Sequence, residues 1–168
     1  LKPPPARAET QMAFLIGHQP LAALGLGAGG VWCGSVWLAT IESECSPLMR
    51  GKLVRATSED TLRTRALTGK PARLLRSAWT AEGESEHAPP TLPNPLPSIE
   101  IGPSWRRIEH AEQSGRYRPE EGAGALITKP VGQVVGMMNE ETSVRAVMTR
   151  MSEQCASVIA SLNEALEE

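Results

Sequence analysis

The fold is predicted from one stretch, Gly27-Ala-Gly-Gly-Val-Trp-Cys-Gly-Ser-Val-Trp-Leu-Ala-Thr40. Its short apolar run, residues 31–33, lies between glycines and predicts a buried parallel strand. Gly34 is expected to end the strand and to let the backbone approach a ligand closely, and Ser35 to cap a helix over residues 36–43. Unpaired N–H groups at a helix start bind anions, so the stretch predicts a phosphate-binding turn. The same pattern also occurs in α/β proteins where the serine is only a helix cap.

Composition narrows the class of protein. The 168 residues are 40% hydrophobic and 21% charged, which is typical of a globular chain with one core. The formal charge of −2, without a basic block, argues against a nucleic-acid partner. No apolar run reaches the roughly 18 residues of a membrane helix. Cys33, Cys45 and Cys155 match neither a zinc pattern nor a disulfide framework, which predicts no metal site and a reducing, cytoplasmic location.

The region before the central stretch reads as a βαβ unit. Met12 to Ile16 is an apolar run that predicts a strand, and Pro20 is placed to start a helix that Gly27 ends. With the strand at 31–33, this unit makes a right-handed crossover that sets the two strands parallel. Their carboxyl ends would share one face, where α/β proteins bind ligands.

Downstream, the pattern is mainly helical. Ser46-Pro47 predicts a helix start with Leu48, Met49 and Leu53 on its apolar face, and Thr68-Gly-Lys-Pro71 predicts a turn. A helix is predicted over Ile99–Gln113, with Trp105 as a core anchor. One group of basic residues is either an anion site or a set of solvated or carboxylate-paired side chains: Arg63, Arg65, Lys70, Arg73 and Arg76.

The last segment has the clearest periodicity. Apolar residues recur at threes and fours from Val144 to Leu166, which predicts an amphipathic helix capped by Asn139 or Thr142. Its methionine-rich stripe is typical of a packing face, so we assign it no chemistry. None of the histidines, His18, His87 and His110, sits in a pattern that indicates catalysis, and no catalytic residue is nominated.

Several separated motifs, in order, resemble the C-terminal half of the nitronate monooxygenases, also called 2-nitropropane dioxygenases. They are Leu24 to Thr40 with Glu42, Ser43 and Glu44; Leu67-Thr-Gly-Lys-Pro-Ala-Arg-Leu-Leu-Arg-Ser-Ala-Trp79; Leu92-Pro-Asn-Pro-Leu96; and Val131-Gly-Gln-Val-Val-Gly-Met-Met-Asn139. The resemblance implies the last two strands of a flavin-binding (β/α)8 (TIM) barrel, in which FMN phosphate lies between two glycine turns.

This resemblance also assigns roles. It implies phosphate contacts from Cys33, Gly34 and Ser35, and a position near the flavin for Gln133. The positions that match the family's first glycine turn are Phe14 and Leu15, which is a departure from its pattern. The implied activity is oxidation of alkyl nitronates by molecular oxygen with FMN as the electron carrier. The alternatives are a flavin-dependent enoyl-thioester reductase and a non-catalytic fragment that associates with itself or with another chain through apolar helix faces.

The expected fold is therefore an α/β C-terminal fragment of a flavin-binding TIM barrel with an added helical segment. Its predicted divisions are a disordered lead-in (1–11), the last β/α units (12–45), a helix and turn-rich insertion (46–88), a proline-rich connector (89–98) and a helical segment (99–168). Such a barrel takes about 250 residues, so we expect this chain alone to bind FMN weakly or not at all and to lack turnover.

Overall fold

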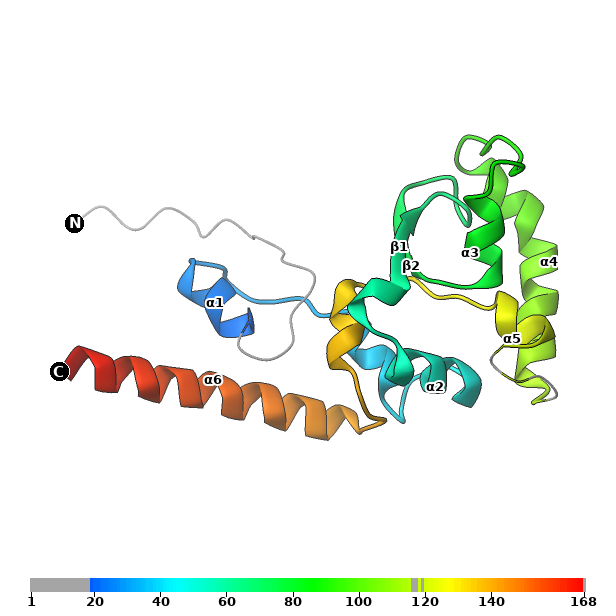
Figure 1. The fold of residues 1–168 in the computed structure, drawn as a ribbon. Helices are drawn as coiled ribbons and strands as arrows, with labels where there is room; N and C mark the ends of the chain where they lie inside the picture. The colour runs from blue at the N-terminus through cyan, green and yellow to red at the C-terminus, as the bar shows by residue number, and fades with distance from the viewer. Residues whose placement is uncertain (1–18, 116–117, 119, 168) are drawn as a thin grey trace.

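The computed structural model describes residues 19–115, 118 and 120–167 and is mixed α/β (Figure 1). In order, the elements are α1 (Gln19–Gly25), η1 (Ser35–Ala39), α2 (Pro47–Arg55), η2 (Ser58–Asp60), β1 (Thr61–Thr64), β2 (Ala72–Leu75), α3 (Ala78–Gly83), α4 (Leu96–Gln113), α5 (Gly122–Leu126), η3 (Gln133–Met137) and α6 (Val144–Glu167), where η marks a 3₁₀ helix. Three expectations lie outside the described residues: the lead-in, the strand at Met12–Ile16 and the position of His18.

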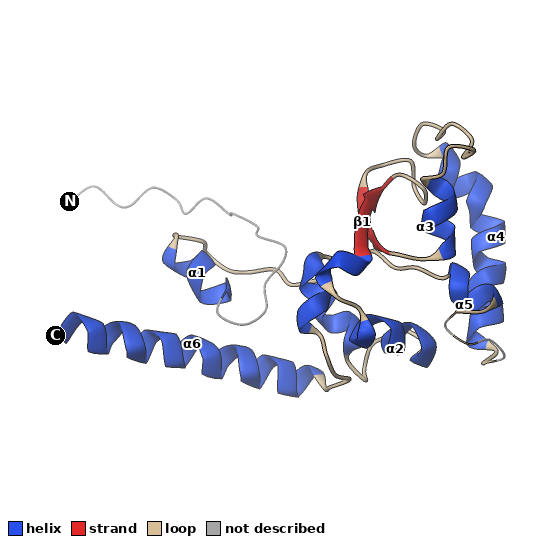
Figure 2. Ribbon diagram, viewed as in Figure 1, coloured by secondary structure: helices blue, strands red, loops and turns tan. Residues whose placement is uncertain are grey.

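Two groups of elements are joined through the short helices η1 and η3. Helices α1 and α6 lie side by side at one end, while α2 to α5 and the β1–β2 hairpin gather at the other (Figures 1 and 2). The segments just before and just after residues 41–141 are paired with each other. Thr40 and Thr142 form a parallel β-bridge, and the Ile41 N–H donates to the Thr142 carbonyl at 2.9 Å. Residues 41–141 therefore form one long connection whose two ends lie next to each other.

Helix α2 provides the centre of the core, as its sequence predicts. The Ser46 hydroxyl accepts a hydrogen bond from the Met49 N–H at 3.1 Å, and Pro47 occupies the first turn. Met49 and Leu53 are almost fully buried, on one face of the helix. They pack in a cluster with residues of β2, η3 and the intervening chain: Leu75, Ile127, Val131, Val134, Val135 and Met138.

The sheet differs from the expected one. In the described residues β1 and β2 pair antiparallel, from Thr61 opposite Leu75 to Thr64 opposite Ala72. The turn at 68–71 is confirmed, and Gly69 there has a φ of +75°, a conformation that side chains other than glycine rarely adopt. The expected strand at Val31–Cys33 is wrong as a regular element, since only Trp32 forms a bridge. Gly30 and Gly34, on either side of the run, limit its length, because glycine weakens a strand.

Helix α4 begins at Leu96, three residues before the expected Ile99 and inside the segment predicted as a proline-rich connector. Proline is tolerated in the first turn of a helix because the N–H that it lacks has no partner there, so Pro97 does not delay the start. Trp105 packs edge-on against Trp79 of α3, with ring centroids 5.5 Å apart. The prediction that Trp105 anchors the core is thus confirmed.

Helix α6 is confirmed, but its cap is not the expected residue. The Ser143 hydroxyl, rather than Asn139 or Thr142, accepts from the Ala146 N–H at 3.1 Å. Of the predicted apolar stripe only Val147 is buried, whereas Met148, Ile159, Leu162 and Leu166 are exposed. No helix within the described ranges is both long and apolar enough to span a membrane.

Candidate functional site

The turn at Gly34-Ser35 and the turn at Gly132-Gln133 lie against each other. The Ser35 hydroxyl at the start of η1 accepts a hydrogen bond from the Gly132 N–H at 2.9 Å, across 97 residues of sequence. Gly132 immediately precedes η3, whose first residue is Gln133. Both turns thus contribute to one site, here called the paired-turn site and defined as residues 33–36 and 132–133.

Ser35 holds this position in a different way from the one expected. It is the first residue of η1 and not its cap, which is Gly34 with φ −108° and ψ −64° and no side-chain cap bond. The helix is a 3₁₀ helix that ends at Ala39, well short of the expected residue 43. Because its hydroxyl is used by Gly132, Ser35 joins two distant turns instead of closing its own helix.

The backbone at this turn presents unpaired donors. Within the described residues, the N–H groups of Gly34, Ser35 and Val36 donate to no acceptor; the first bond of η1 runs from the Trp37 N–H to the Gly34 carbonyl at 3.3 Å. A Cβ built on Gly34 would meet no atom within 4 Å. The turn therefore combines anion-binding donors with open space in front of its glycine.

Two side chains hold the turn in place. The Trp37 indole N–H donates to the Cys33 carbonyl at 2.6 Å, and the Thr40 hydroxyl donates to the Trp37 carbonyl at 2.8 Å. Cys33 is half-buried and Gly34 is exposed. The turn is consequently braced from the protein side and accessible from the solvent side.

Gln133 lies at the edge of the same site. Its side chain is exposed and, among the described residues, makes no hydrogen bond, while its carbonyl accepts from the Ser58 hydroxyl at 2.7 Å. Ser58 also packs closely against the far end of η3, where a Cβ on Gly136 would lie 2.5 Å from its Oγ. The backbone of Gln133 is fixed and its amide group remains available to a ligand.

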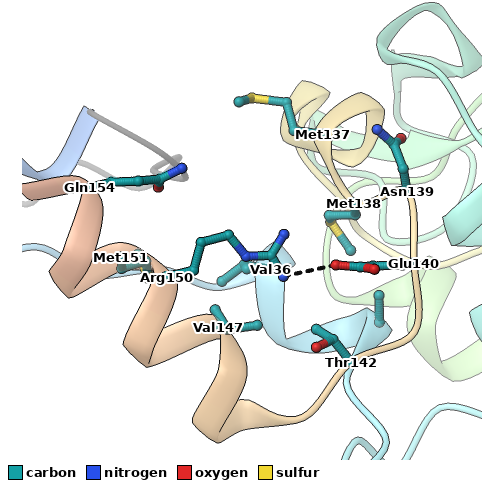
Figure 3. A pocket seen from close by; sticks show the side chains of 11 residues that line it. Val36, Met137, Met138, Asn139, Glu140, Thr142, Val147, Arg150, Met151 and Gln154 are labelled. Atoms are coloured by element: carbon teal, nitrogen blue, oxygen red, sulfur yellow. Dashed lines mark ion pairs between the residues drawn. The ribbon is translucent and has the colours of Figure 1, made fainter. Parts of the chain in front are cut away.

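A small hollow of about 30 Å³ opens beside η1, η3 and the start of α6. Arg150 of α6 reaches toward Glu140, and the two side chains form an ion pair at 3.1 Å (Figure 3). The buried Gln154 Oε1, also in the lining, makes no hydrogen bond to any residue that the structure describes, a feature that the sequence does not reveal. The remaining lining is mostly apolar: Val36, Ala39, Met137, Met138, Asn139, Thr142, Val147 and Met151.

Residues 33–36 and 132–133 include no histidine, lysine or carboxylate that could act as an acid or base. His87 and His110 are exposed and distant in sequence from both turns. Among the described residues, the titrating groups with a shifted pKa, Lys52 and Asp60, lie outside this site. Burial lowers the pKa of Lys52, whose ammonium donates to the Gly124 and Ile127 carbonyls. A hydrogen bond from a backbone N–H in the η2 cap lowers the pKa of Asp60.

The sequence matches the profile of one protein family, nitronate monooxygenase, over residues 15–155. It is also 45% identical over 146 residues to Rv1533 of Mycobacterium tuberculosis, a protein assigned as a monooxygenase. That match covers 87% of this chain and 38% of the relative.

Solved structures show the same fold in longer chains. Nitroalkane oxidase from Streptomyces ansochromogenes superposes with a TM-score of 0.69 at 24% identity, over 90% of this chain and 40% of that one. The enoyl reductase domain of MlnA from Bacillus amyloliquefaciens superposes with a TM-score of 0.53 at 15% identity, over 90% and 48%. The chain thus spans less than half the length of each of these three proteins.

Proposed function

The chain belongs to the nitronate monooxygenase family, and on that premise we propose that it is the C-terminal part of an FMN-dependent enzyme that oxidises alkyl nitronates. In this proposal it supplies the end of a flavin-binding TIM barrel, with a helical segment added. The odd number and wide spacing of its cysteines support a reducing compartment, and the cytoplasm is the proposed location.

One observation carries the proposal: the hydrogen bond between Ser35 and Gly132 at 2.9 Å. The family resemblance implies flavin contacts at Gly34-Ser35 and at Gln133, two turns that are far apart in sequence. A single cofactor can contact both only if they are adjacent in space. Their adjacency therefore supports a common ligand.

The residues at the paired-turn site fit a phosphate group. The N–H groups of Gly34, Ser35 and Val36 are unpaired within the described residues, and the space in front of Gly34 is open. These donors would hold the FMN phosphate, as helix starts and glycine turns hold anions in other proteins. Cys33 would contribute to the same contact, and the hydrogen bond from the Trp37 indole N–H to the Cys33 carbonyl keeps its backbone in place. The unpaired amide of Gln133 would bind a second polar group of the cofactor.

FMN, when bound, would supply the electron transfer between the nitronate and oxygen. The described residues contribute binding and orientation: the paired-turn site fixes the phosphate end, and η3 holds Gln133 at its edge. No described side chain is assigned the role of base, so the proton chemistry is proposed to belong to the part of the enzyme outside this chain.

The proposal is tested by following backbone amide NMR signals of the 168-residue chain during titration with FMN. We expect weak binding that moves the signals of residues 34–36 and 133. Gly34→Val should abolish these shifts by filling the space in front of the turn. Gly30→Val is the matched control, because a Cβ at Gly30 also meets nothing within 4 Å and the position lies outside the site.

Unchanged signals at residues 34–36, or equal effects of the two valine variants, would contradict the assignment. Stoichiometric flavin absorbance after desalting would instead contradict only the expected weakness of binding by a chain this short.

An enoyl-thioester reductase is the second candidate, because the fold is shared with an enoyl reductase domain. The 45% identity to a protein assigned as a monooxygenase favours the first candidate. Consumption of NAD(P)H with an enoyl thioester, without oxygen consumption with a nitronate, would select the reductase. A mass that rises with concentration in light scattering, with no FMN response, would select a self-associating fragment.

A further inference from the structure

A second polar site lies on the β1–β2 hairpin, away from the paired-turn site. It is an open hollow of about 600 Å³ between the end of β1, the end of α3 and the chain that follows α3. Six polar residues line it: Arg63, Thr64, Arg65, Glu84, Ser85 and Thr91. Neither the family assignment nor the proposed FMN site uses any of these residues.

The two arginines in the lining have no partner in the described residues. Neither Arg63 nor Arg65 forms an ion pair or a side-chain hydrogen bond there, and both are exposed. Guanidinium groups on a protein surface are commonly paired with carboxylates or carbonyls, so two unpaired ones at a single hollow leave a full set of donors for a ligand.

The hairpin register adds a third positive charge. Arg63 lies directly opposite Arg73, and residues opposite each other in an antiparallel pair project from the same face. Arg73 donates to the Thr61 hydroxyl at 2.9 Å and not to an acid. Like charges in this arrangement destabilise the hairpin, and a bound anion would remove that repulsion.

Glu84 is the one acid in the lining, and it does not neutralise the site. Its carboxylate accepts a hydrogen bond from the Thr64 hydroxyl, which holds it against the hairpin. The lining therefore carries two positive charges against one negative charge.

The lining of the hollow also includes the hydroxyl group of Ser85. The Ser85 Oγ is buried and makes no hydrogen bond to the described part of the chain. A rotation about its χ1 angle toward the hollow would therefore break no hydrogen bond, and a bound oxyanion would give the hydroxyl an acceptor.

We propose that this hollow binds the phosphate group of a small soluble molecule, through the guanidinium groups of Arg63 and Arg65. Phosphate oxygens match the forked donor geometry of arginine, which is why arginine is favoured for phosphate recognition. The site is independent of FMN at residues 34–36 and would let a phosphate-bearing molecule bind to the same chain at the same time.

Pyrophosphate is the probe for the test, with amide NMR signals as the readout. Saturable shifts are expected at residues 64–65 and 84–85, but not with sodium chloride of equal ionic strength. The double variant Arg63→Gln/Arg65→Gln should raise the Kd at least about ten-fold. Replacing both by lysine keeps the charge but loses the fork, and should give an intermediate Kd. Arg145→Gln, at an exposed position of α6, is the matched control and should leave the Kd unchanged.

Two results would overturn the proposal: absence of saturable shifts at these residues, or a Kd that the glutamine variants do not change. Arg65→Gln alone covers the case in which the double variant fails to fold, because Arg65 lies beyond the end of β1; an unchanged Kd there would also overturn it. Gly34→Val should spare pyrophosphate binding, and the double variant should spare the FMN shifts, so each proposal can fail separately.

Discussion

Replacing Ser35 by alanine tests the contact on which the paired-turn site depends. The Ser35 hydroxyl is the acceptor for the Gly132 N–H, and Gly132 is buried. Its loss leaves a buried donor without an acceptor, which costs about 1–3 kcal/mol of unfolding free energy, more than the roughly 1 kcal/mol net value of a typical hydrogen bond. Ser35→Ala should therefore lower stability by about 1–3 kcal/mol.

Urea unfolding followed by tryptophan fluorescence measures this change, because Trp37 lies beside the contact. Ser98→Ala is the control: Ser98 is an exposed serine of α4, where the substitution should change stability by no more than about 0.5 kcal/mol. Amide hydrogen exchange gives a local readout, since the Gly132 N–H should exchange faster in Ser35→Ala.

A result equal to the control, with unchanged exchange at Gly132, would refute the reasoning. It would mean that the two turns stay together without the serine, or that another acceptor replaces it. Ser35→Thr, which keeps the hydroxyl, should retain most of the protection at Gly132.

Three further substitutions probe the surroundings of the site. Leu53→Ala removes a side chain with 0% exposure from the core and should cost about 2–5 kcal/mol in urea unfolding. Gly136→Ala places a Cβ 2.7 Å from the Ser58 backbone N and should cost about 1–3 kcal/mol by the same assay, whereas Gly30→Ala meets no atom and should be near neutral. Asp60→Asn should lower stability at pH 7, because the folded-state pKa of Asp60 lies below 3.8 and the ionised carboxylate therefore stabilises the folded protein. The stabilisation by this carboxylate is complete above pH 3.8. The difference in stability between variant and parent, measured by unfolding curves, should vanish as the pH falls through the folded-state pKa.

Local signals in the sequence were sufficient for several elements. Ser46-Pro47 combines a cap and a first-turn proline with an apolar face, and α2 begins there. The turn at 68–71 follows from the freedom of Gly69, and α6 from its periodicity. In each case the stabilising contacts lie within a few residues of one another, so the pattern alone carries the information.

Contacts between distant residues were not predictable in this way. Ser35 has the character of a helix cap, yet its hydroxyl binds an N–H 97 residues away, and nothing near it in the sequence indicates that partner. The sequence predicts the turn at 68–71 but not the β1–β2 pairing beside it. The residues of β1, Thr-Leu-Arg-Thr, are too few and too mixed in polarity to indicate a strand. Of the candidate site, the sequence predicts the turn at Gly34-Ser35 and the family resemblance singles out Gln133, but only the structure shows that these two segments meet.

The bridge between Thr40 and Thr142 bears on how chains of this kind can vary in length. Because the two ends of residues 41–141 are fixed next to each other, the chain between them can lengthen or shorten without moving η1 away from α6. The entropy of closing a flexible loop grows slowly, by about 0.6 kcal/mol for each doubling of its length. Exposed stretches between residues 41 and 141, such as residues 89–94, are therefore where evolution could add or remove residues at least cost to the paired turns.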